Sequence, residues 1–286
     1  MPSLLVFGGT GFVGSRLLTV GAQRGFTLAA TYHSTTPGAG PPHTRTALGN
    51  DVAWSHCDLS DQRSIDARLF EVKPDVVVNA AYVKDGPTSD VVCGIASGWI
   101  AEAAERHDAR FVHVSTDLVF DGTLGRSYGE DDATNPLSAY GTAKLLGEQR
   151  ILDASTNAAI ARTSIIYGHS SAPQETLTKK ALNSNEIAFF TNEWRSPIHV
   201  EDLAIALLDL AGSKAAGIIH VAGAERVDRL TFATMLAEHE GHDPDELIGR
   251  LQDASIGPRP EDVSLDISRA VALGLHLPGV SHRLTS

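Results

Sequence analysis

A glycine-rich turn between a short apolar run and an amphipathic segment sharply narrows the folds open to this chain. Leu4–Phe7 is apolar, residues 8–14 contain four glycines, and residues 12–24 carry apolar side chains at helical spacing before Gly25. After a strand and before a helix, such glycines permit a tight turn, close approach of backbone N–H groups to a pyrophosphate, and close helix–strand packing. The pattern therefore predicts the first unit of a dinucleotide-binding fold.

Strand and helix signals alternate along the first 163 residues. Strands are predicted at 4–7, 27–32, 75–79, 110–115 and 157–162, and helices at 12–24, 60–70, 91–107 and 138–152. Loops are predicted at 34–50, which is rich in Pro, Gly and Thr, and at 120–137. Strands that alternate with helices of this length indicate a parallel sheet with right-handed crossovers. The predicted fold class is therefore α/β, a doubly wound parallel sheet of the Rossmann type.

Beyond Thr163 the alternation loosens. The predicted elements there are helices at 174–184, 201–210 and 229–239, strands at 187–190 and 217–221, and a tail rich in Pro, Gly and Asp. We expect residues 1–163, with the returning segment 199–222, to form the NAD(P)-binding core. Residues 164–198 and 223–286 are expected to form a smaller substrate-binding lobe over the strand ends, where open sheets bind ligands.

The charge of the chain is acidic and uneven. Its 286 residues carry a net charge of -12, yet no Asp or Glu precedes Asp51, so the first 50 residues are +3 and the rest -15. The negative net charge argues against a nucleic-acid partner, because proteins that bind nucleic acids usually carry a stripe of basic residues. No apolar run approaches the ~20 residues that span a membrane, and the N-terminus does not resemble a signal peptide. Cys57 and Cys93 form no disulfide framework or zinc spacing. We therefore expect a soluble, cytoplasmic protein.

The end of the second predicted strand bears on the choice of cofactor. Residues 31–34 contain no acidic side chain, whereas an NAD-binding unit usually offers a carboxylate there to the ribose 2′-hydroxyl. A 2′-phosphate is repelled by a carboxylate but accepted by hydroxyls, by His33 or by an arginine. The sequence thus favours NADPH, with NADH as the alternative. The acid-free first 50 residues fit the same conclusion.

A tyrosine and a lysine four residues apart, Tyr140 and Lys144, share one face of a predicted helix. Chance predicts only about 0.1 such pairs in a chain of this composition. An ammonium beside a phenol stabilises the phenolate and so lowers the phenol pKa toward neutrality. Thr116 follows a predicted strand, where its hydroxyl can polarise a substrate carbonyl.

Together these motifs resemble the extended short-chain dehydrogenases/reductases. The resemblance rests on the glycine turn, Cys57–Leu59, Asn79–Ala81, Ser115–Gly122 and the Tyr140/Lys144 pair. The run STDLVFDG at 115–122 is its most specific part. The chain is similar to the dTDP-4-dehydrorhamnose reductase branch in that run and in Arg162–Ser164, Arg195–Ala204, Arg259–Pro260 and Ser264–Asp266. The resemblance covers essentially the whole chain.

The resemblance implies a role for each motif. Tyr140 is implied as the proton donor, Lys144 as its pKa-lowering neighbour and cofactor anchor, and Thr116 as the carbonyl-binding hydroxyl. The expected cofactor-binding residues, besides Tyr140 and Lys144, are Gly8, Thr10, Gly11, Phe12, Val13, Gly14, His33, Asp58, Leu59, Ala80 and Ala81. The expected substrate-binding residues are Asp117 and Arg195, and no metal site is expected.

The implied activity is NADPH-dependent reduction of a nucleotide-activated keto-deoxysugar, dTDP-linked and reduced at C4. The implied partner is the nucleotide-sugar substrate, with a homodimer as a candidate assembly. Two residues depart from the pattern of the family. Leu118 occupies a position at which rhamnose-forming enzymes usually have Tyr, and Cys93 occupies a position at which relatives often have an active-site Asn. Three alternatives stay open. They are a non-catalytic regulatory subunit like that of methionine adenosyltransferase, a sugar-nucleotide epimerase, and a reductase of a small non-sugar ketone.

Overall fold

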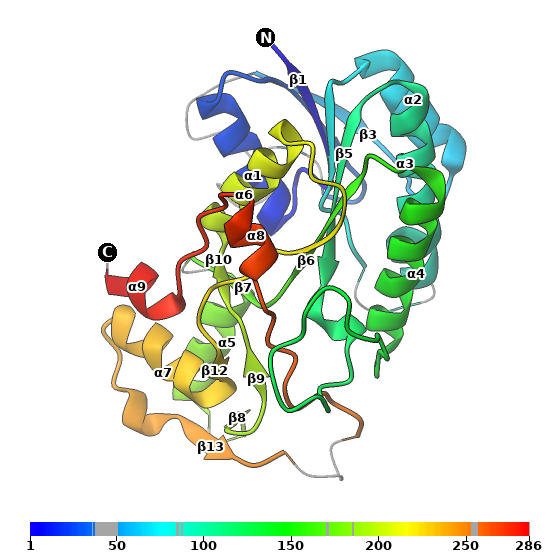
Figure 1. Cartoon of the computed structure of the whole chain (residues 1–286). Coiled ribbons are helices and arrows are strands. Elements are labelled where there is room, and N and C mark those ends of the chain that lie inside the picture. The colour runs from blue at the N-terminus through cyan, green and yellow to red at the C-terminus, as the bar shows by residue number, and fades with distance from the viewer. Residues whose placement is uncertain are drawn as a thin grey trace. The chain divides into compact units, whose positions relative to one another are not determined.

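A seven-stranded sheet forms the centre of the computed structural model (Figure 1). The structure describes residues 1–35, 37, 51–83, 86, 88–169, 172–184, 186–252 and 257–285. The strand order is β11-β6-β5-β4-β1-β2-β3, and β1 pairs in parallel with both β2 and β4. The strands are β1 (Ser3–Phe7), β2 (Thr27–Tyr32), β3 (Val52–His56), β4 (Val76–Asn79), β5 (Arg110–Thr116), β6 (Ala159–Thr163) and β11 (Gly217–His220).

Helices cover both faces of this sheet. Figure 1 shows α1 (Phe12–Gln23) and α6 (Val200–Gly212) on one face, and α2 (Gln62–Val72), α3 (Ala96–Arg106) and α4 (Ala139–Ala154) on the other. The side chains between the sheet and the second helix layer are fully buried and apolar, among them Leu5, Phe7, Ile65, Ile100 and Ile160. This architecture confirms the predicted doubly wound α/β fold.

The edge strand β3 was absent from the sequence prediction. It pairs in parallel with β2, from Leu28 with Val52 to Tyr32 with His56. Because β3 lies at the edge of the sheet, its side chains are only partly buried or exposed, and the sequence Val-Ala-Trp-Ser-His shows no continuous apolar run. The predicted loop at 34–50 lies largely outside the described residues.

The chain divides into two compact units. Unit 1 comprises residues 1–116, 139–162 and 204–219, and unit 2 comprises 117–138, 163–203 and 220–286. The sequence prediction placed 117–138 with the cofactor-binding core, whereas this segment packs within unit 2. The reason lies in long-range backbone pairing, because Tyr128 N donates to Ser264 O (2.8 Å) and Asp266 N donates to Tyr128 O (2.8 Å).

Unit 2 is built from short strands and helices around two small apolar clusters. Tyr167, Val227, Phe232 and Leu236 belong to one cluster, and Phe189 belongs to the other. Its strands are β7 (Ile166–Tyr167), β8 (Ala188–Phe190), β9 (Trp194–Arg195), β10 (Ile198–His199), β12 (Val227–Asp228) and β13 (Ile248–Arg250). Its helices are α5 (Pro173–Leu182), α7 (Arg229–His239), α8 (Ser268–Ala272) and α9 (Val280–Thr285).

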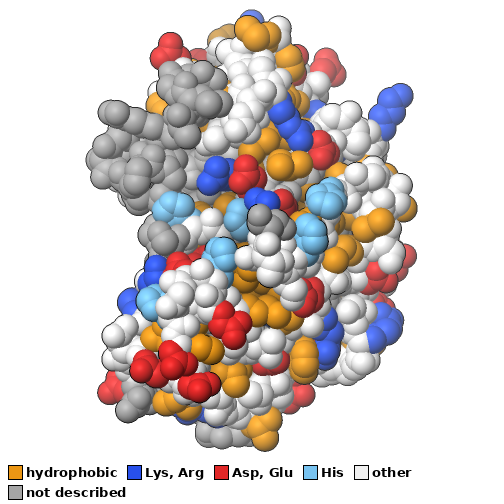
Figure 2. Space-filling model, turned by 90° about the vertical axis from the view of Figure 1, so that its left-hand side faces the viewer, with side chains coloured by type: hydrophobic (Ala, Val, Ile, Leu, Met, Phe, Trp, Pro, Cys, Tyr) orange, Lys and Arg blue, Asp and Glu red, His pale blue; other side chains and the backbone are white. Residues whose placement is uncertain are grey.

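Charged side chains of both signs mix on the surface. On the face drawn in Figure 2, several acidic side chains gather near the lower left, and the basic ones visible there are scattered and form no continuous stripe among the described residues. Within the same described part of the chain, no helix is both long and apolar enough to cross a membrane.

Candidate active site

The glycine turn joins β1 to α1 through very close backbone contacts. Gly8 has φ +80°, and a Cβ on it would lie 2.8 Å from the Cα of Ala81. A Cβ on Gly14 would lie 2.1 Å from the carbonyl oxygen of Gly8. Both positions therefore require glycine, the first for its left-handed conformation and both for lack of space. The turn also lies directly against the segment that follows β4.

The first turn of α1 has the properties of an anion site. Gly11 is the N-cap and makes no side-chain capping hydrogen bond, and the first turn contains no acidic residue. The N–H groups that follow, beginning at Phe12 and Val13, belong to the helix end that has no intrahelical acceptors. These donors and the helix dipole favour a phosphate group. The residues present therefore fit the pyrophosphate of a dinucleotide, with Thr10 on the same turn.

Replacing Gly14 by alanine is expected to weaken NADPH binding at least tenfold. The added methyl group must displace the Gly8 carbonyl, which belongs to backbone and cannot rotate away. Fluorescence titration with NADPH measures the effect, and circular dichroism shows whether the fold persists. Gly212→Ala is the matched control, because a Cβ there meets nothing within 4 Å. Equal affinities for the two variants would contradict this reading of the turn.

A buried polar pair supports the segment after β4. The amide nitrogen of Asn79 donates to Nδ1 of His113 on β5 (3.2 Å), and Asn79 Oδ1 accepts from the N–H of Ala81 (3.1 Å). Ala80 N donates to Phe7 O (3.0 Å). Asn79 thus links β5 to the Ala80–Ala81 segment beside the glycine turn. Neither Asn79 nor His113 was among the predicted site residues, because their pairing across 34 residues leaves no local signal.

Burial keeps His113 uncharged, because it lowers the pKa of the imidazole well below its ordinary value, and the charge of Lys144 acts in the same direction. The unfolded chain takes up a proton here near the ordinary histidine range of about 6.5, whereas the folded protein does not. This contribution to stability is therefore fully present above that range and is lost as the pH falls below it.

We expect the unfolding free energy to decrease by up to about 1.4 kcal/mol per pH unit below that range on account of His113. Urea unfolding of the wild type and of His113→Gln, at about pH 7.5 and about pH 5.5, measures this contribution. The wild type should lose more stability between the two pH values than the variant. The same loss in both proteins would show that His113 is not the cause.

Three of the expected cofactor-binding residues, His33, Asp58 and Leu59, lie just beyond the ends of β2 and β3. The ring of His33 lies 5.6 Å from that of His56, measured between centroids. Asp58 accepts from the N–H (2.9 Å) and the hydroxyl (2.7 Å) of Ser60, and these bonds lower the pKa of its carboxyl. Leu59 is buried. The strand end therefore brings together His33 and Asp58, with His56 as a neighbour that the sequence prediction did not include.

The three residues predicted to be catalytic all belong to unit 1. Thr116 ends β5 and is buried, whereas Tyr140 stands near the start of α4 and is half-buried. Lys144, one turn further along α4, is buried and its Nζ donates to the carbonyl oxygen of Val114 (2.7 Å). The ring of Tyr82 lies edge-on to that of Tyr140 at 6.4 Å between centroids.

A buried ion pair holds α4 to the sheet one turn beyond Lys144. Glu148 on α4 accepts from Nε (3.0 Å) and Nη2 (2.7 Å) of Arg162 on β6, and from the hydroxyl of Ser115 on β5. Burial lowers the pKa of Lys144, and the negative charge of Glu148 acts in the opposite direction. Glu148 was not predicted as a site residue, since its partners lie on two other strands.

Cys93 is fully buried in a π-helical turn (Asp90–Ile95) before α3. Its Sγ accepts from the N–H of Val83 (3.3 Å) and donates to the carbonyl of the same residue (3.4 Å). The thiol therefore binds the backbone next to Tyr82.

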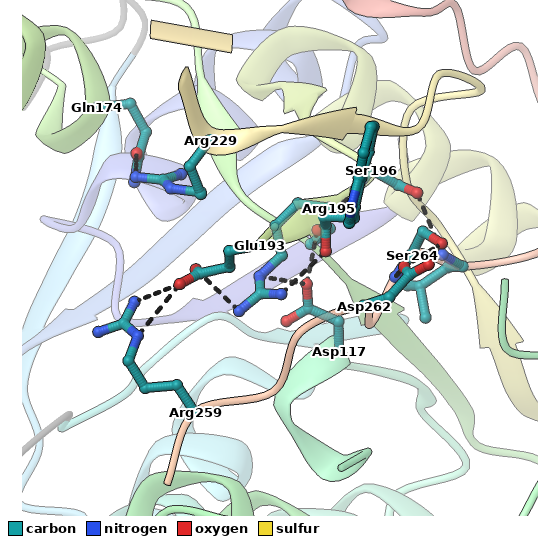
Figure 3. A network of polar contacts seen from close by, with 12 residues as sticks. Asp117, Gln174, Glu193, Arg195, Ser196, Arg229, Arg259, Asp262 and Ser264 are labelled. Atoms are coloured by element: carbon teal, nitrogen blue, oxygen red, sulfur yellow. Dashed lines mark hydrogen bonds and ion pairs between the residues drawn. The ribbon is translucent and has the colours of Figure 1, made fainter. Parts of the chain in front are cut away.

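Both predicted substrate-binding residues belong to unit 2 and are buried there (Figure 3). Asp117 accepts from the hydroxyl of Ser164 (2.6 Å) and lies 3.8 Å from Nε of Arg195. Nη2 of Arg195 lies 3.0 Å from Oε1 of Glu193. The two predicted residues are thus neighbours, and carboxylates surround the guanidinium of Arg195. Among the described residues, no group of three or more His, Cys, Asp or Glu side chains is placed to hold a metal ion.

Comparison with known proteins gives the chain a clear set of relatives. A family model described as the RmlD substrate binding domain matches residues 2–284. The dTDP-4-dehydrorhamnose reductase of Mycolicibacterium smegmatis is 33% identical over 247 residues, which cover 82% of this chain and 73% of that protein. Methionine adenosyltransferase 2 subunit beta of Bos taurus is 29% identical over 241 residues, covering 78% and 72%.

Solved structures agree on the fold. The crystal structure of dTDP-4-dehydrorhamnose reductase from Bacillus anthracis in complex with NADP superposes with a TM-score of 0.79 and 19% identity. The match covers 99% of this chain and 97% of that one. These findings confirm the family resemblance that the sequence motifs indicated.

Proposed function

This chain belongs to the RmlD-like branch of the extended short-chain dehydrogenases/reductases, and we propose that it reduces a nucleotide-linked keto-deoxysugar to the alcohol with NADPH. The observation that carries the proposal is the grouping in unit 1 of Tyr140, buried Lys144 and Thr116 with a glycine turn shaped for a pyrophosphate. The proposed position of the ketone is C4 and the proposed nucleotide is dTDP, as in the name of the Mycolicibacterium relative.

The proposed chemistry divides between cofactor and protein. When bound, NADPH supplies a hydride to the carbonyl carbon. Tyr140 donates a proton to the carbonyl oxygen, and the Thr116 hydroxyl donates a hydrogen bond to the same oxygen. The ammonium of Lys144, held by the Val114 carbonyl, stabilises the phenolate that Tyr140 leaves behind. Glu148 keeps α4 in register with β5, so that the phenol and the ammonium stay at the strand ends.

NADPH is the proposed cofactor, with NADH as a weaker alternative. The described part of β2 and the residues after it offer hydroxyls and His33, and no carboxylate, next to the predicted ribose position. NADP is the cofactor in the Bacillus anthracis structure. The pyrophosphate is assigned to residues 8–14, the adenine to Asp58 and Leu59, and the cofactor channel to Ala80 and Ala81.

A spectrophotometric screen tests the proposal. Purified protein is incubated with NADPH or NADH and a panel of nucleotide-linked 4-keto-6-deoxysugars, with free keto sugars and small ketones as controls. We expect consumption of NADPH only with a nucleotide-linked ketone. If only free ketones are reduced, the substrate is not a nucleotide-linked sugar and the proposed substrate class is wrong. If no ketone is reduced, the proposed function is wrong.

A second candidate is a cofactor-binding regulatory subunit, favoured by the similarity to methionine adenosyltransferase 2 subunit beta. In that case the protein binds NADPH, consumes none of it with any ketone, and co-purifies with a catalytic partner. The chain contains all three of Thr116, Tyr140 and Lys144, and their presence supports the hypothesis that it is an enzyme rather than a regulatory subunit.

A further inference from the structure

One face of α4 carries a buried carboxylate in line with the two residues assigned to proton transfer. Tyr140, Lys144 and Glu148 follow one another at intervals of four residues, so they share one face of the helix. Lys144 is 2% exposed and Glu148 is 1% exposed. All three residues belong to unit 1. The carboxylate therefore lies one helical turn from the ammonium, away from solvent.

The sheet fixes the Glu148 carboxylate in place. Its Oε1 accepts from Nε of Arg162 on β6 (3.0 Å) and from the hydroxyl of Ser115 on β5, and its Oε2 accepts from Nη2 of Arg162 (2.7 Å). Arg162 and Ser115 are buried as well. These charge-assisted hydrogen bonds offset the cost of burying a carboxylate, and they fix its orientation beside Lys144.

The network holds two buried cations and one buried anion. Arg162 pairs directly with Glu148, and the same carboxylate acts on the ammonium of Lys144. Burial lowers the pKa of Lys144, and the negative charge of Glu148 acts in the opposite direction. Charges interact strongly in a protein interior, because little water is present to screen them. The carboxylate thus offsets part of the cost of keeping Lys144 protonated inside the protein.

Other elements of unit 1 also face Lys144. On β5, the Val114 carbonyl accepts from Nζ (2.7 Å), and His113 is uncharged, because burial and the charge of Lys144 hold its pKa well below the ordinary value. The π-helical turn before α3 contributes the thiol of Cys93. The phenol on α4 is also neutral in its proton-donating form. Of these described neighbours, Glu148 is the one that carries a negative charge at neutral pH.

We propose that Glu148 is a positioning residue of the reaction, which acts by keeping the buried ammonium of Lys144 protonated. Lys144 stabilises the phenolate of Tyr140 only while it is charged, so this carboxylate sets the upper pH limit of catalysis. The inference rests on the proposed function for the roles of Tyr140 and Lys144. The protonation state of Lys144, by contrast, can be measured without any substrate.

An NMR titration of Lys144 tests the proposal directly. The full chain is labelled with 13C at the Cε atoms of its lysines, and the signal of Lys144 is identified by its absence from Lys144→Arg. We expect Glu148→Gln to lower the pKa of Lys144 by about one pH unit or more, the usual effect of removing a nearby opposite charge. The glutamine side chain has the size of glutamate and keeps one acceptor oxygen, so the substitution changes mainly the charge.

Two control variants separate the charge of Glu148 from its structural role. Arg162→Gln breaks the same ion pair but leaves the carboxylate beside Lys144, so the pKa of Lys144 should not fall. Asp153→Asn removes an exposed negative charge from the same helix, and solvent screening should limit its effect to about 0.2 pH units. If Glu148→Gln fails to fold, the double variant Glu148→Gln/Arg162→Gln replaces it, because it removes the carboxylate without leaving a buried guanidinium unpaired.

The pH dependence of kcat provides a second measurement. In the wild type, kcat should fall at high pH as the Tyr140–Lys144 pair loses its first proton. In Glu148→Gln this fall should occur at a pH lower by about one unit, with a smaller change on the plateau below it. A purely structural role of Glu148 would instead lower kcat by the same factor at every pH.

Three results would overturn the inference. They are an unchanged pKa of Lys144 in Glu148→Gln, an equal decrease in Arg162→Gln, and an equal decrease in Asp153→Asn. The proposed function is judged separately, by consumption of NADPH with a keto-sugar nucleotide. If no ketone is reduced while Glu148→Gln still lowers the pKa of Lys144, the function is wrong and the effect of Glu148 on Lys144 stands. If the wild type reduces the ketone while that pKa stays unchanged, only the role of Glu148 is removed.

Discussion

Replacing Tyr140 by phenylalanine is expected to lower kcat about a thousandfold, within the range that general acid catalysis contributes. The substitution removes the only group assigned to protonate the carbonyl oxygen and leaves the ring in place. Lys144 keeps its hydrogen bond to Val114, so the fold and the affinity for NADPH should change little. Steady-state kinetics with the best substrate of the panel measures kcat, and fluorescence titration measures NADPH affinity.

Tyr82→Phe is the matched control for this substitution. Tyr82 packs edge-on against Tyr140 at 6.4 Å between ring centroids and is 60% exposed, yet it has no assigned part in proton transfer. Loss of its hydroxyl should leave kcat within about threefold of the wild type. A Tyr140→Phe variant that retains full kcat, or a Tyr82→Phe variant that loses as much, would remove Tyr140 from the role of proton donor.

Replacing Glu148 by alanine is expected to lower the free energy of unfolding by about 3–5 kcal/mol. Glu148 and Arg162 are 1% and 2% exposed, so the substitution leaves a buried guanidinium without its counter-charge and the Ser115 hydroxyl without its acceptor. Because small domains are stable by only about 5–15 kcal/mol, this loss is large. Urea unfolding followed by circular dichroism measures it.

Two further variants separate the ion pair from other effects of changing α4. Asp153→Ala removes an exposed acid from the same helix and should shift stability by less than about 0.5 kcal/mol. Ser115→Ala removes only one donor to Glu148 and should cost about 1 kcal/mol. If Glu148→Ala unfolds at the same urea concentration as Asp153→Ala, the buried pair does not hold α4 to the sheet.

The fold of unit 1 could be predicted because its signals are local. The apolar run of β1, the glycines after it and the helical spacing of α1 occupy consecutive residues, and β4 is a four-residue run that is buried throughout. The edge strand β3 was not predicted because it is half-exposed and lacks an apolar run. In unit 2 the strands β7, β9, β10 and β12 have two residues each, too few to show a period.

In the candidate site, too, the residues in local motifs could be predicted and those paired over long sequence distances could not. The Tyr140/Lys144 spacing and the Gly8–Gly14 turn are short motifs, so both could be named as candidate site residues from the sequence alone. Two buried pairs join different elements: Asn79 with His113, and Glu148 with Arg162. Such pairs follow no regular spacing in the sequence, so they could not be predicted from it. The pairing of Glu193 with Arg259 was missed for a similar reason, because the two residues are separated by 66 positions.

The uneven charge of the sequence acquires a physical interpretation from the structure. The acid-free N-terminal segment contains the glycine turn, where negative side chains would oppose a pyrophosphate. The rest of the chain is strongly acidic, yet it also contains buried basic side chains, such as Arg195, which lies beside Glu193. An anionic cofactor can thus bind an acidic protein, because the local charge around the glycine turn decides that contact.

Isotope transfer tests the central claim most directly. NADPH that carries deuterium at the transferable position of the nicotinamide C4 is incubated with the protein and a dTDP-linked 4-keto-6-deoxysugar, and the sugar product is analysed by mass spectrometry and NMR. The proposed function predicts one deuterium in each product molecule, bound to the new carbinol carbon. Product without deuterium, or no product while NADPH remains bound, would contradict hydride transfer to a sugar ketone at this site.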